Sequence, residues 1–153
     1  VMIVDLVRND LSITAAQQSV KVDELFGVYS FSNVHQMISS ISSKVKEGVH
    51  FTEVIKKSFP MGSMTGAPKI MAMNLIEEFE HTKRGIYSGS VGYITPDGDF
   101  DFNVIIRSLQ YNATNKYLSY MVGGAITDNS DPEEEYQECE IKAASIKKVL
   151  AGG

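Results

Sequence analysis

Residues 59–69 read FPMGSMTGAPK and lead directly into an amphipathic segment. Pro68 lacks a backbone N–H, which costs nothing in the first turn of a helix. Thr65 is a candidate N-cap, because its hydroxyl can accept a hydrogen bond from a free N–H of that turn. Apolar residues then recur at helical spacing, at Ala72, Leu75, Ile76 and Phe79. The pattern predicts a glycine-rich turn followed by a helix over about 66–80.

The start of this helix is a candidate anion site. Free N–H groups and the positive end of the helix dipole attract negative charge, and Lys69 adds a formal positive charge. The turn lacks the Gly-Lys-Ser/Thr sequence of a P-loop. An ordinary capped helix start is the alternative, since glycine, serine and threonine are common in turns.

Composition and charge narrow the classes of function. The chain has 153 residues, 43% hydrophobic and 22% charged, as expected for one globular domain with its own core. The net charge of −5 argues against non-specific nucleic-acid binding, and no apolar run is long enough for a membrane span. With a single cysteine and no signal peptide, we expect a cytoplasmic protein without nucleic-acid or membrane partners.

The rest of the chain alternates helical and extended patterns. The remaining predicted elements are helices at 1–11 and 51–59, extended segments at 19–27 and 28–47, and strands at 86–95, 100–110 and 117–122. In strand 100–110 we expect Phe100, Phe102, Val104 and Ile106 in the core, and Asp101, Asn103, Ile105 and Arg107 on a polar face. The elements predict an α+β fold in which antiparallel-rich sheets pack with helices.

A helix near the C-terminus carries the most informative spacing. Asp131 suits the N-cap and Pro132 the first helical position. Glu135, Glu138 and Lys142 then follow at intervals of three and four and form one stripe. Two carboxylates on one face can bind a hard divalent cation, and the lysine can meet an anionic substrate. The alternative is a solvated face stabilised by Glu–Lys pairs.

Five stretches of the chain form a recognisable set. Residues 60–69 read PMGSMTGAPK; the others read MIVDLVRNDL at 2–11, RGIYSGSVGY at 84–93, NVIIRS at 103–108, and VGGAITDNS at 122–130 followed by EYQE at 135–138. Taken in the order of the sequence, they resemble the motifs of the chorismate-utilising enzymes. That family includes anthranilate synthase component I, aminodeoxychorismate synthase component I, isochorismate synthase and salicylate synthase. The resemblance covers nearly the whole chain.

The resemblance implies a Mg²⁺-dependent site for chorismate, a dicarboxylate with a hydroxyl leaving group. By this resemblance Glu138 binds Mg²⁺ and Glu135 lies beside the metal. The substrate contacts that it implies are Ser63, Thr65, Tyr87, Arg107, Gly123, Gly124 and Lys142. It also implies that His35 is a catalytic residue that contacts chorismate near a ring oxygen, although a lone histidine in a strand is more often structural.

Within the family, Val22 to Phe26 with the following VYSF, and the EYQE of 135–138, look closest to aminodeoxychorismate synthase component I. That enzyme replaces the C4 hydroxyl of chorismate with an amino group for folate synthesis, and a glutamine amidotransferase partner supplies the ammonia. Anthranilate synthase component I and the isochorismate or salicylate synthases are the alternatives. From another class, a non-catalytic, partner-binding module is the alternative.

Two features depart from the family pattern. Ala125 stands where the family has a third glycine, which puts the shape of the carboxylate-binding loop in doubt. The family's PI-x-GT segment and a second magnesium glutamate have no counterpart, and the chain opens inside an apolar helical pattern. We therefore expect residues 1–153 to be the C-terminal part of one chorismate-binding domain. Alone they should bind chorismate weakly and not turn it over.

Overall fold

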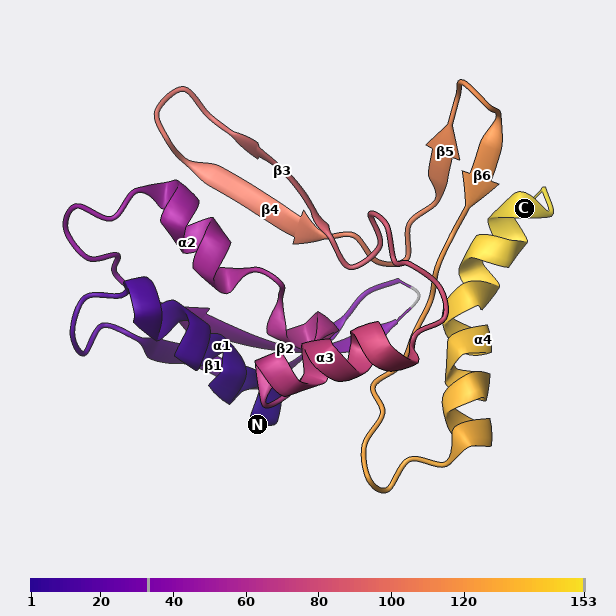
Figure 1. Cartoon of the computed structure of the whole chain (residues 1–153), viewed down its shortest axis with the longest axis horizontal. Coiled ribbons are helices and arrows are strands. Elements are labelled where there is room, and N and C mark those ends of the chain that lie inside the picture. Colours follow the sequence, from indigo (N-terminus) through magenta and orange to yellow (C-terminus); the bar gives the residue numbers. More distant parts are fainter. Residues whose placement is uncertain (33, 153) are drawn as a thin grey trace. The chain divides into compact units, whose positions relative to one another are not determined.

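The computed structural model describes residues 1–32 and 34–152 (Figure 1). The chain folds into two compact units, Val1–Thr82 and Lys83–Gly153. Both units combine helices with antiparallel strands, which confirms the predicted α+β class. Within the described ranges, no helix is long and apolar enough to cross a membrane.

The first unit combines helices with one long β-hairpin. Its elements are α1 (Met2–Thr14), β1 (Lys21–Ser30), β2 (His35–Ser42), α2 (Phe51–Ser58), the 3₁₀ helix η1 (Gly62–Met64) and α3 (Lys69–Phe79). The helices predicted at 1–11 and 51–59 are confirmed, and the extended segments form the hairpin of β1 and β2. The pairing of β1 is irregular before Gly27, where Phe26 has a φ of 58°. Such a bulge bends the strand and increases its twist.

The second unit consists of two short hairpins and a long helix. Its elements are β3 (Ser90–Ile94), β4 (Phe100–Val104), β5 (Gln110–Asn112), β6 (Tyr117–Ser119) and α4 (Pro132–Leu150). Strand β3 pairs with β4, and β5 with β6, both antiparallel. The predicted N-cap of α4 is confirmed: the Asp131 carboxylate accepts from the N–H groups of Glu133 at 3.0 Å and Glu134 at 3.1 Å.

The strand predicted at 86–95 begins later than expected. Extended pairing starts at Ser90, because the preceding residues form a turn in which Ser88 has a φ of 67°. The N–H of Tyr87 donates to the carbonyl of Arg84 at 3.0 Å inside this turn. Tyr87 is therefore presented by a turn and not by a strand.

The strand predicted at 100–110 ends at Val104. The N–H of Ile106 donates to the carbonyl of Val104 at 3.0 Å, so the backbone folds back over a single residue. The alternation of faces stops at this tight turn. Ile105, which we expected on the polar face, is consequently buried, whereas the expected core residues Phe100 and Phe102 are exposed. That part of the prediction was wrong.

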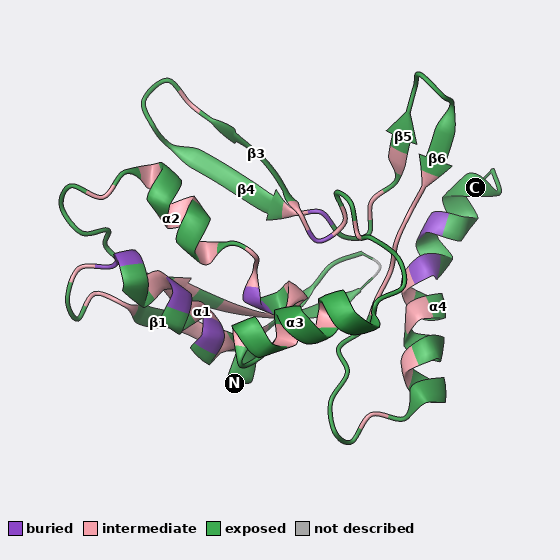
Figure 2. Cartoon of the chain, viewed as in Figure 1, coloured by how far each residue is buried: buried purple, intermediate pink, exposed green. Residues whose placement is uncertain are grey.

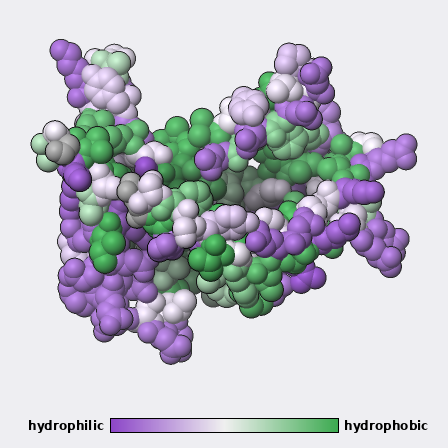
Figure 3. All heavy atoms as spheres, turned by 180° about the vertical axis from the view of Figure 1, so that it is seen from behind, coloured by the Kyte–Doolittle hydropathy of each residue, from purple (hydrophilic) through white to green (hydrophobic). Residues whose placement is uncertain are grey.

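Few side chains are fully buried in either unit (Figure 2). The buried apolar residues among those described are Leu6, Ala15, Ile105, Ala143 and Ile146. Many large apolar side chains reach the surface instead, as the green areas of Figure 3 show. The described residues thus lack the substantial core that we expected from length and composition. Exposed apolar surface of this extent is typical of faces that pack against further protein.

Candidate functional site

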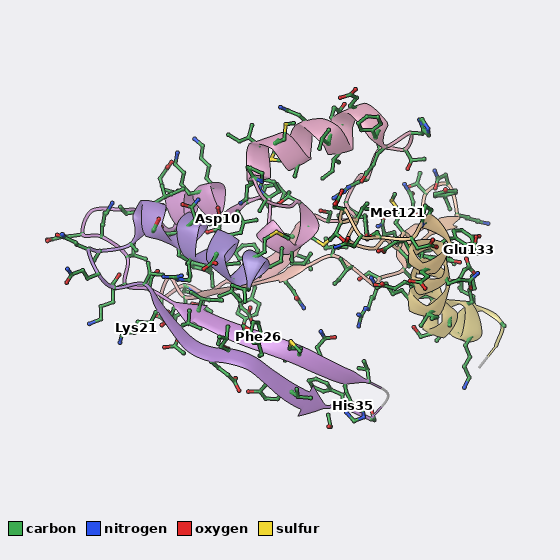
Figure 4. All side chains as sticks on the ribbon, turned by 90° about the horizontal axis from the view of Figure 1, so that it is seen from below. Asp10, Lys21, Phe26, His35, Met121 and Glu133 are labelled. Atoms are coloured by element: carbon green, nitrogen blue, oxygen red, sulfur yellow. The ribbon has the colours of Figure 1, made fainter. Side chains whose placement is uncertain are left out.

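A cluster of side chains forms in the second unit, where α4 contacts the segment that holds Gly123 and Gly124. Figure 4 labels Met121, which precedes this segment, and Glu133, which lies in the first turn of α4. The predicted stripe of Glu135, Glu138 and Lys142 supplies the helix side of the cluster. The cap at Asp131 fixes where α4 begins, and thereby which face this stripe occupies.

Glu135 has one satisfied and one unsatisfied carboxylate oxygen. Its Oε1 accepts a hydrogen bond from the hydroxyl of Ser130 at 2.6 Å. Its Oε2 is buried and has no hydrogen-bond partner among the described residues. A β-carbon on Gly124 would lie only 2.9 Å from this oxygen. A buried, unpartnered carboxylate oxygen is costly, so its position favours a cation or donor that completes the site.

Lys142 connects the helix to the glycine segment. Its ammonium donates to the carbonyl oxygen of Gly123 at 3.0 Å and forms an ion pair with Glu138, one helical turn away. The Lys142 side chain is 28% exposed, whereas that of Glu138 is 51% exposed. Partial burial strengthens the attraction between the two charges compared with a fully solvated pair. Lys142 therefore fixes the backbone at Gly123 and places positive charge beside it.

Tyr87 reaches the same segment from the turn before β3. Its hydroxyl oxygen lies 3.0 Å from where a β-carbon on Gly123 would be. The turn is held by a hydrogen bond from the Arg84 guanidinium to the hydroxyl of buried Ser88, at 3.2 Å. The N–H of Ser88 also donates to the carbonyl of Ile105 at 3.0 Å. The tyrosine ring is thus carried by a turn that is tied to the end of hairpin β3–β4.

The two glycines have a structural role that the sequence did not reveal. The resemblance implied only that they contact the substrate. In the structure the space beside Gly123 admits the hydroxyl of Tyr87, and the space beside Gly124 admits the carboxylate of Glu135. The absent side chains therefore allow the protein's own functional groups to gather at this segment.

Arg107 lies just beyond β4 in a left-handed backbone conformation, with a φ of 50°. It is exposed, and its guanidinium has no hydrogen bond or ion pair with the described residues. The structure therefore shows no hydrogen bond or ion pair, among the residues it describes, between Arg107 and the cluster at Gly123. Its planar set of donors remains available for a carboxylate.

Ser63 and Thr65 lie in the first unit, in and just after η1. Ser63 is exposed. The hydroxyl of Thr65 donates to the carbonyl oxygens of Met61 at 3.2 Å and Gly62 at 3.4 Å. The prediction that Thr65 caps the following helix is wrong, because α3 starts after Pro68 and has no side-chain cap.

The prediction that the charge of Lys69 serves an anion site also needs correction. Its ammonium lies 2.5 Å from the carboxylate of Asp10. The positive charge expected at this helix start is therefore matched within the protein, and it adds no net charge for a bound anion. On α1, Asp5 and Arg8 form a second ion pair, which is exposed on the helix surface and has 2.8 Å between nitrogen and oxygen.

His35 is exposed at the start of β2, at the tip of the β1–β2 hairpin (Figure 4). Its Nδ1 lies 2.9 Å from the hydroxyl oxygen of Ser30, the residue opposite in the hairpin. This hydrogen bond orients the ring of the exposed histidine. The assignment of a catalytic role to His35 stays a prediction.

The donor set of the cluster fits Mg²⁺ in part. Among the described residues, no group of three or more histidine, cysteine, aspartate or glutamate side chains is placed to hold a metal. Mg²⁺ often takes only one or two protein carboxylates and completes its coordination with water and substrate oxygens. The free Oε2 of Glu135 and the carboxylate of Glu138 on the next turn suit that mode.

Two contacts were missed by the sequence interpretation. Ser130 orients Glu135, although its place in the motif at 122–130 gave no role for its hydroxyl. The contact between Asp10 and Lys69 spans 59 positions, and no local pattern links them. Ser130, Asp10 and Lys69 all lie in the matched motifs, and this was the only sign in the sequence that they matter.

Comparisons with known proteins were consistent with one another. A sequence profile described as chorismate binding enzyme matches residues 1–148. The aminodeoxychorismate synthase component 1 of Escherichia coli is 42% identical over 149 residues, which are 97% of this chain and 32% of that protein. The anthranilate synthase component 1 of Aquifex aeolicus is 38% identical over 149 residues, which are 97% of this chain and 30% of that protein.

The fold is also similar to that of a solved structure. The crystal structure of anthranilate synthase component I from Streptococcus pneumoniae matches with a TM-score of 0.79 and 34% identity, over 94% of this chain and 32% of that chain. The chain therefore spans about a third of the length of these relatives.

Proposed function

Because this chain belongs to the family of chorismate binding enzymes, we propose that it contributes the chorismate site of an aminodeoxychorismate synthase component I. The proposed reaction replaces the C4 hydroxyl of chorismate with an amino group, depends on Mg²⁺, and serves folate synthesis. The ammonia comes from a glutamine amidotransferase subunit, and the enzyme works in the cytoplasm. The activity belongs to the longer protein that contains these residues.

One observation carries this proposal: the cluster around Gly123 and Gly124 has the groups that a dicarboxylate substrate needs. The buried, unpartnered Oε2 of Glu135 calls for a cation. Lys142 holds positive charge at the carbonyl of Gly123, and the hydroxyl of Tyr87 is next to the same residue. A bare anionic substrate would be repelled by the two glutamates, so a metal ion and a lysine at this place are complementary requirements.

Each residue then has a defined task. Glu135 and Glu138 would hold Mg²⁺, which would clamp a carboxylate of chorismate and lower the negative potential around the leaving hydroxyl. Lys142 compensates negative charge and keeps the glycine segment in place. Tyr87 donates a hydrogen bond to the bound carboxylate. Arg107 can bind a carboxylate through two parallel hydrogen bonds.

Ser63 and Thr65 are also proposed substrate contacts, and His35 a proposed catalytic residue. Ser63 is exposed and can donate its hydroxyl proton. Thr65 has its proton engaged by backbone carbonyls, so its hydroxyl oxygen would act as an acceptor. His35, oriented through Ser30, would exchange a proton with a ring oxygen through Nε2.

The choice of amination rests on similarity. The identity to the aminodeoxychorismate synthase component 1 is 42%, and that to the anthranilate synthase component 1 is 38%, over equal lengths. The second candidate is therefore an anthranilate synthase component I, which would also release pyruvate. Isochorismate or salicylate synthesis would use water in place of ammonia, and a partner-binding segment would leave chorismate unchanged.

Product analysis tests the proposal. The longest natural protein that contains these residues is incubated with chorismate, Mg²⁺ and ammonium, and the products are identified by mass spectrometry. Aminodeoxychorismate without release of pyruvate supports the proposal. Anthranilate with pyruvate, or isochorismate or salicylate, would replace it by the corresponding alternative. Unchanged chorismate, together with no thermal stabilisation by chorismate and Mg²⁺, would refute a chorismate site.

A further inference from the structure

Helix α1 has one buried face, and that face carries a charge. Its buried residues are Leu6, Asp10 and Thr14, which lie four positions apart and therefore on one side of the helix. Asp10, labelled in Figure 4, is only 7% exposed. A carboxylate in such a place is unfavourable unless an opposite charge or several donors compensate it.

Lys69 provides the compensation. Its ammonium is 2.5 Å from Oδ2 of Asp10, and the side chains of Lys69 and Asp10 are 16% and 10% exposed. The other ion pair on α1, between Arg8 and Asp5, differs in burial, because its side chains are 52% and 57% exposed. A solvated pair of that kind contributes little, whereas breaking a buried pair leaves an uncompensated charge.

A second contact fixes the same stretch of chain to α1. Gly62, the first residue of η1, is buried, and a β-carbon there would lie 2.8 Å from Cδ2 of Leu6. Leu6 and Asp10 are one helical turn apart. The segment 63–68 is therefore held at both of its ends on one face of α1, by a close packing contact at Gly62 and by the ion pair at Lys69.

We infer that Asp10 and Lys69 are positioning residues for substrate binding: their ion pair fixes segment 63–68 so that Ser63 and Thr65 meet chorismate. The inference rests on the proposed function. Because the ion pair matches the charge of Lys69, the segment offers neutral hydroxyl groups to the substrate and no free cation. Neither Asp10 nor Lys69 needs to touch the substrate in this role.

The test uses the longest natural protein that contains these residues. Three variants change the pair: Asp10→Asn, Lys69→Met, and the double variant that carries both substitutions. Asp5→Asn is the matched control, since Asp5 is on the same helix, forms an exposed ion pair, and lies outside the candidate site. The measurements are kcat and KM for chorismate, and hydrogen–deuterium exchange at the amides of Met64 and Thr65. In the folded protein these amides donate to the carbonyls of Met61 and Gly62.

We expect each single variant to raise the KM for chorismate about 10-fold or more, as positioning contacts around a site commonly do, with a smaller change in kcat. Exchange at Met64 and Thr65 should become faster, because the segment loses one of its two anchors. The double variant should lose less than the product of the two single effects, since it leaves no unpaired buried charge. Asp5→Asn should change neither KM nor exchange.

Other outcomes would overturn the inference. If the single variants lower only the thermal stability, and KM and exchange stay as in the parent protein, the pair is a structural contact without a positioning role. If neither single variant folds, the double variant decides, and an unchanged KM and unchanged exchange in it refute the inference. If the parent protein does not turn over chorismate, the proposed function fails, and exchange alone decides whether the pair anchors segment 63–68.

Discussion

The carboxylate of Glu135 occupies the space beside Gly124 in which any other residue would carry its β-carbon, with a separation of 2.9 Å. The same oxygen, Oε2, is buried and unpartnered within the described part of the chain. Glycine at this position is therefore a condition for the placement of the carboxylate. Tyr87 and Gly123 repeat the relationship one residue earlier.

Gly124→Ala should move the carboxylate of Glu135 and leave the fold nearly intact. The clashing atom is the tip of a flexible side chain, so we expect a loss of unfolding free energy below about 1 kcal/mol. Displacement of a metal-binding group commonly weakens metal affinity about 10-fold or more. A titration with Mg²⁺ in the presence of chorismate, followed by thermal unfolding, measures this shift. An unchanged Mg²⁺ requirement would contradict the role assigned to Gly124.

Gly92→Ala should lower the free energy of unfolding more than Gly124→Ala does. A β-carbon on Gly92 would lie 2.0 Å from the carbonyl oxygen of Asp101 and 2.8 Å from the Cα of Phe102, which are backbone atoms of the paired strand. The hairpin of β3 and β4 would have to separate, at a cost of about 1–3 kcal/mol. Urea unfolding measures the loss, with Gly124→Ala as the comparison. Equal urea midpoints for Gly92→Ala and Gly124→Ala would contradict this reasoning, in which Gly92 faces rigid backbone atoms and Gly124 faces the flexible tip of a side chain.

Glu135→Gln should remove the response to Mg²⁺. The amide keeps the size of the carboxylate but lacks the charge that a hard cation requires. We expect the melting temperature with chorismate and Mg²⁺ to fall to the value measured after addition of a chelator. Glu133→Gln is the control, because Glu133 lies on the same helix and, among the described residues, its side chain bonds only to Gln137, at 3.0 Å. Continued stabilisation of Glu135→Gln by Mg²⁺ would place the metal elsewhere.

Lys142→Met should weaken substrate binding. The variant leaves the carbonyl of Gly123 without its donor and Glu138 without its ion-pair partner. A lost charge-assisted hydrogen bond costs about 1.5–3 kcal/mol, which corresponds to a rise in KM of about 10-fold or more. Lys147→Met is the matched control on α4, since Lys147 pairs with Glu140 on the exposed surface. Equal KM values for both lysine variants would argue against the site.

Asp131→Ala should destabilise α4 at its first turn. The carboxylate accepts from two N–H groups that otherwise have no partner in the helix, and loss of such a cap costs about 1 kcal/mol. Asp128→Ala, three residues earlier in the exposed loop, controls for the change of charge. Thermal unfolding compares the two variants. A cap effect predicts a lower melting temperature only for Asp131→Ala.

Local features of the fold could be predicted from the sequence because neighbouring residues determine them. Asp131 and Pro132 specify the start of α4 through capping and a fixed backbone angle. The turn at 96–99 specifies the hairpin of β3 and β4. The N–H of Thr95 closes this turn by donating a hydrogen bond to the carbonyl of Asp99 at 2.8 Å. In both cases the decisive interactions lie within a few positions in the sequence.

Burial and long-range pairing could not be predicted in the same way. Ile105 was assigned to the wrong face of the strand, because a tight turn ends the alternation of faces at Val104. The partner of Asp10 is 59 positions away, and neither helical spacing nor capping rules connect them. The exposed apolar faces show a further reason: patterns predict which side is apolar, but not which surface covers it.

The site cluster was predicted from motifs and not from spacing. The stripe of Glu135, Glu138 and Lys142 is equally compatible with a solvated helix face. Only the resemblance placed Tyr87, Gly123 and Gly124 in the same site, and the structure brings these residues together with the stripe. Within the described part of the chain, no hydrogen bond or ion pair joins Arg107 to them.

The strand pairs of the described chain join only consecutive strands, β1 with β2, β3 with β4, and β5 with β6. Hairpins of this kind close within about 1–10 μs, while a ribosome adds only about 5–20 residues per second. Each hairpin can therefore form as soon as its second strand has emerged. The contact between Asp10 and Lys69 has to wait for about 60 residues of synthesis. The order of translation would thus build hairpin β1–β2 before the anchored loop of the first unit, and hairpins β3–β4 and β5–β6 after it.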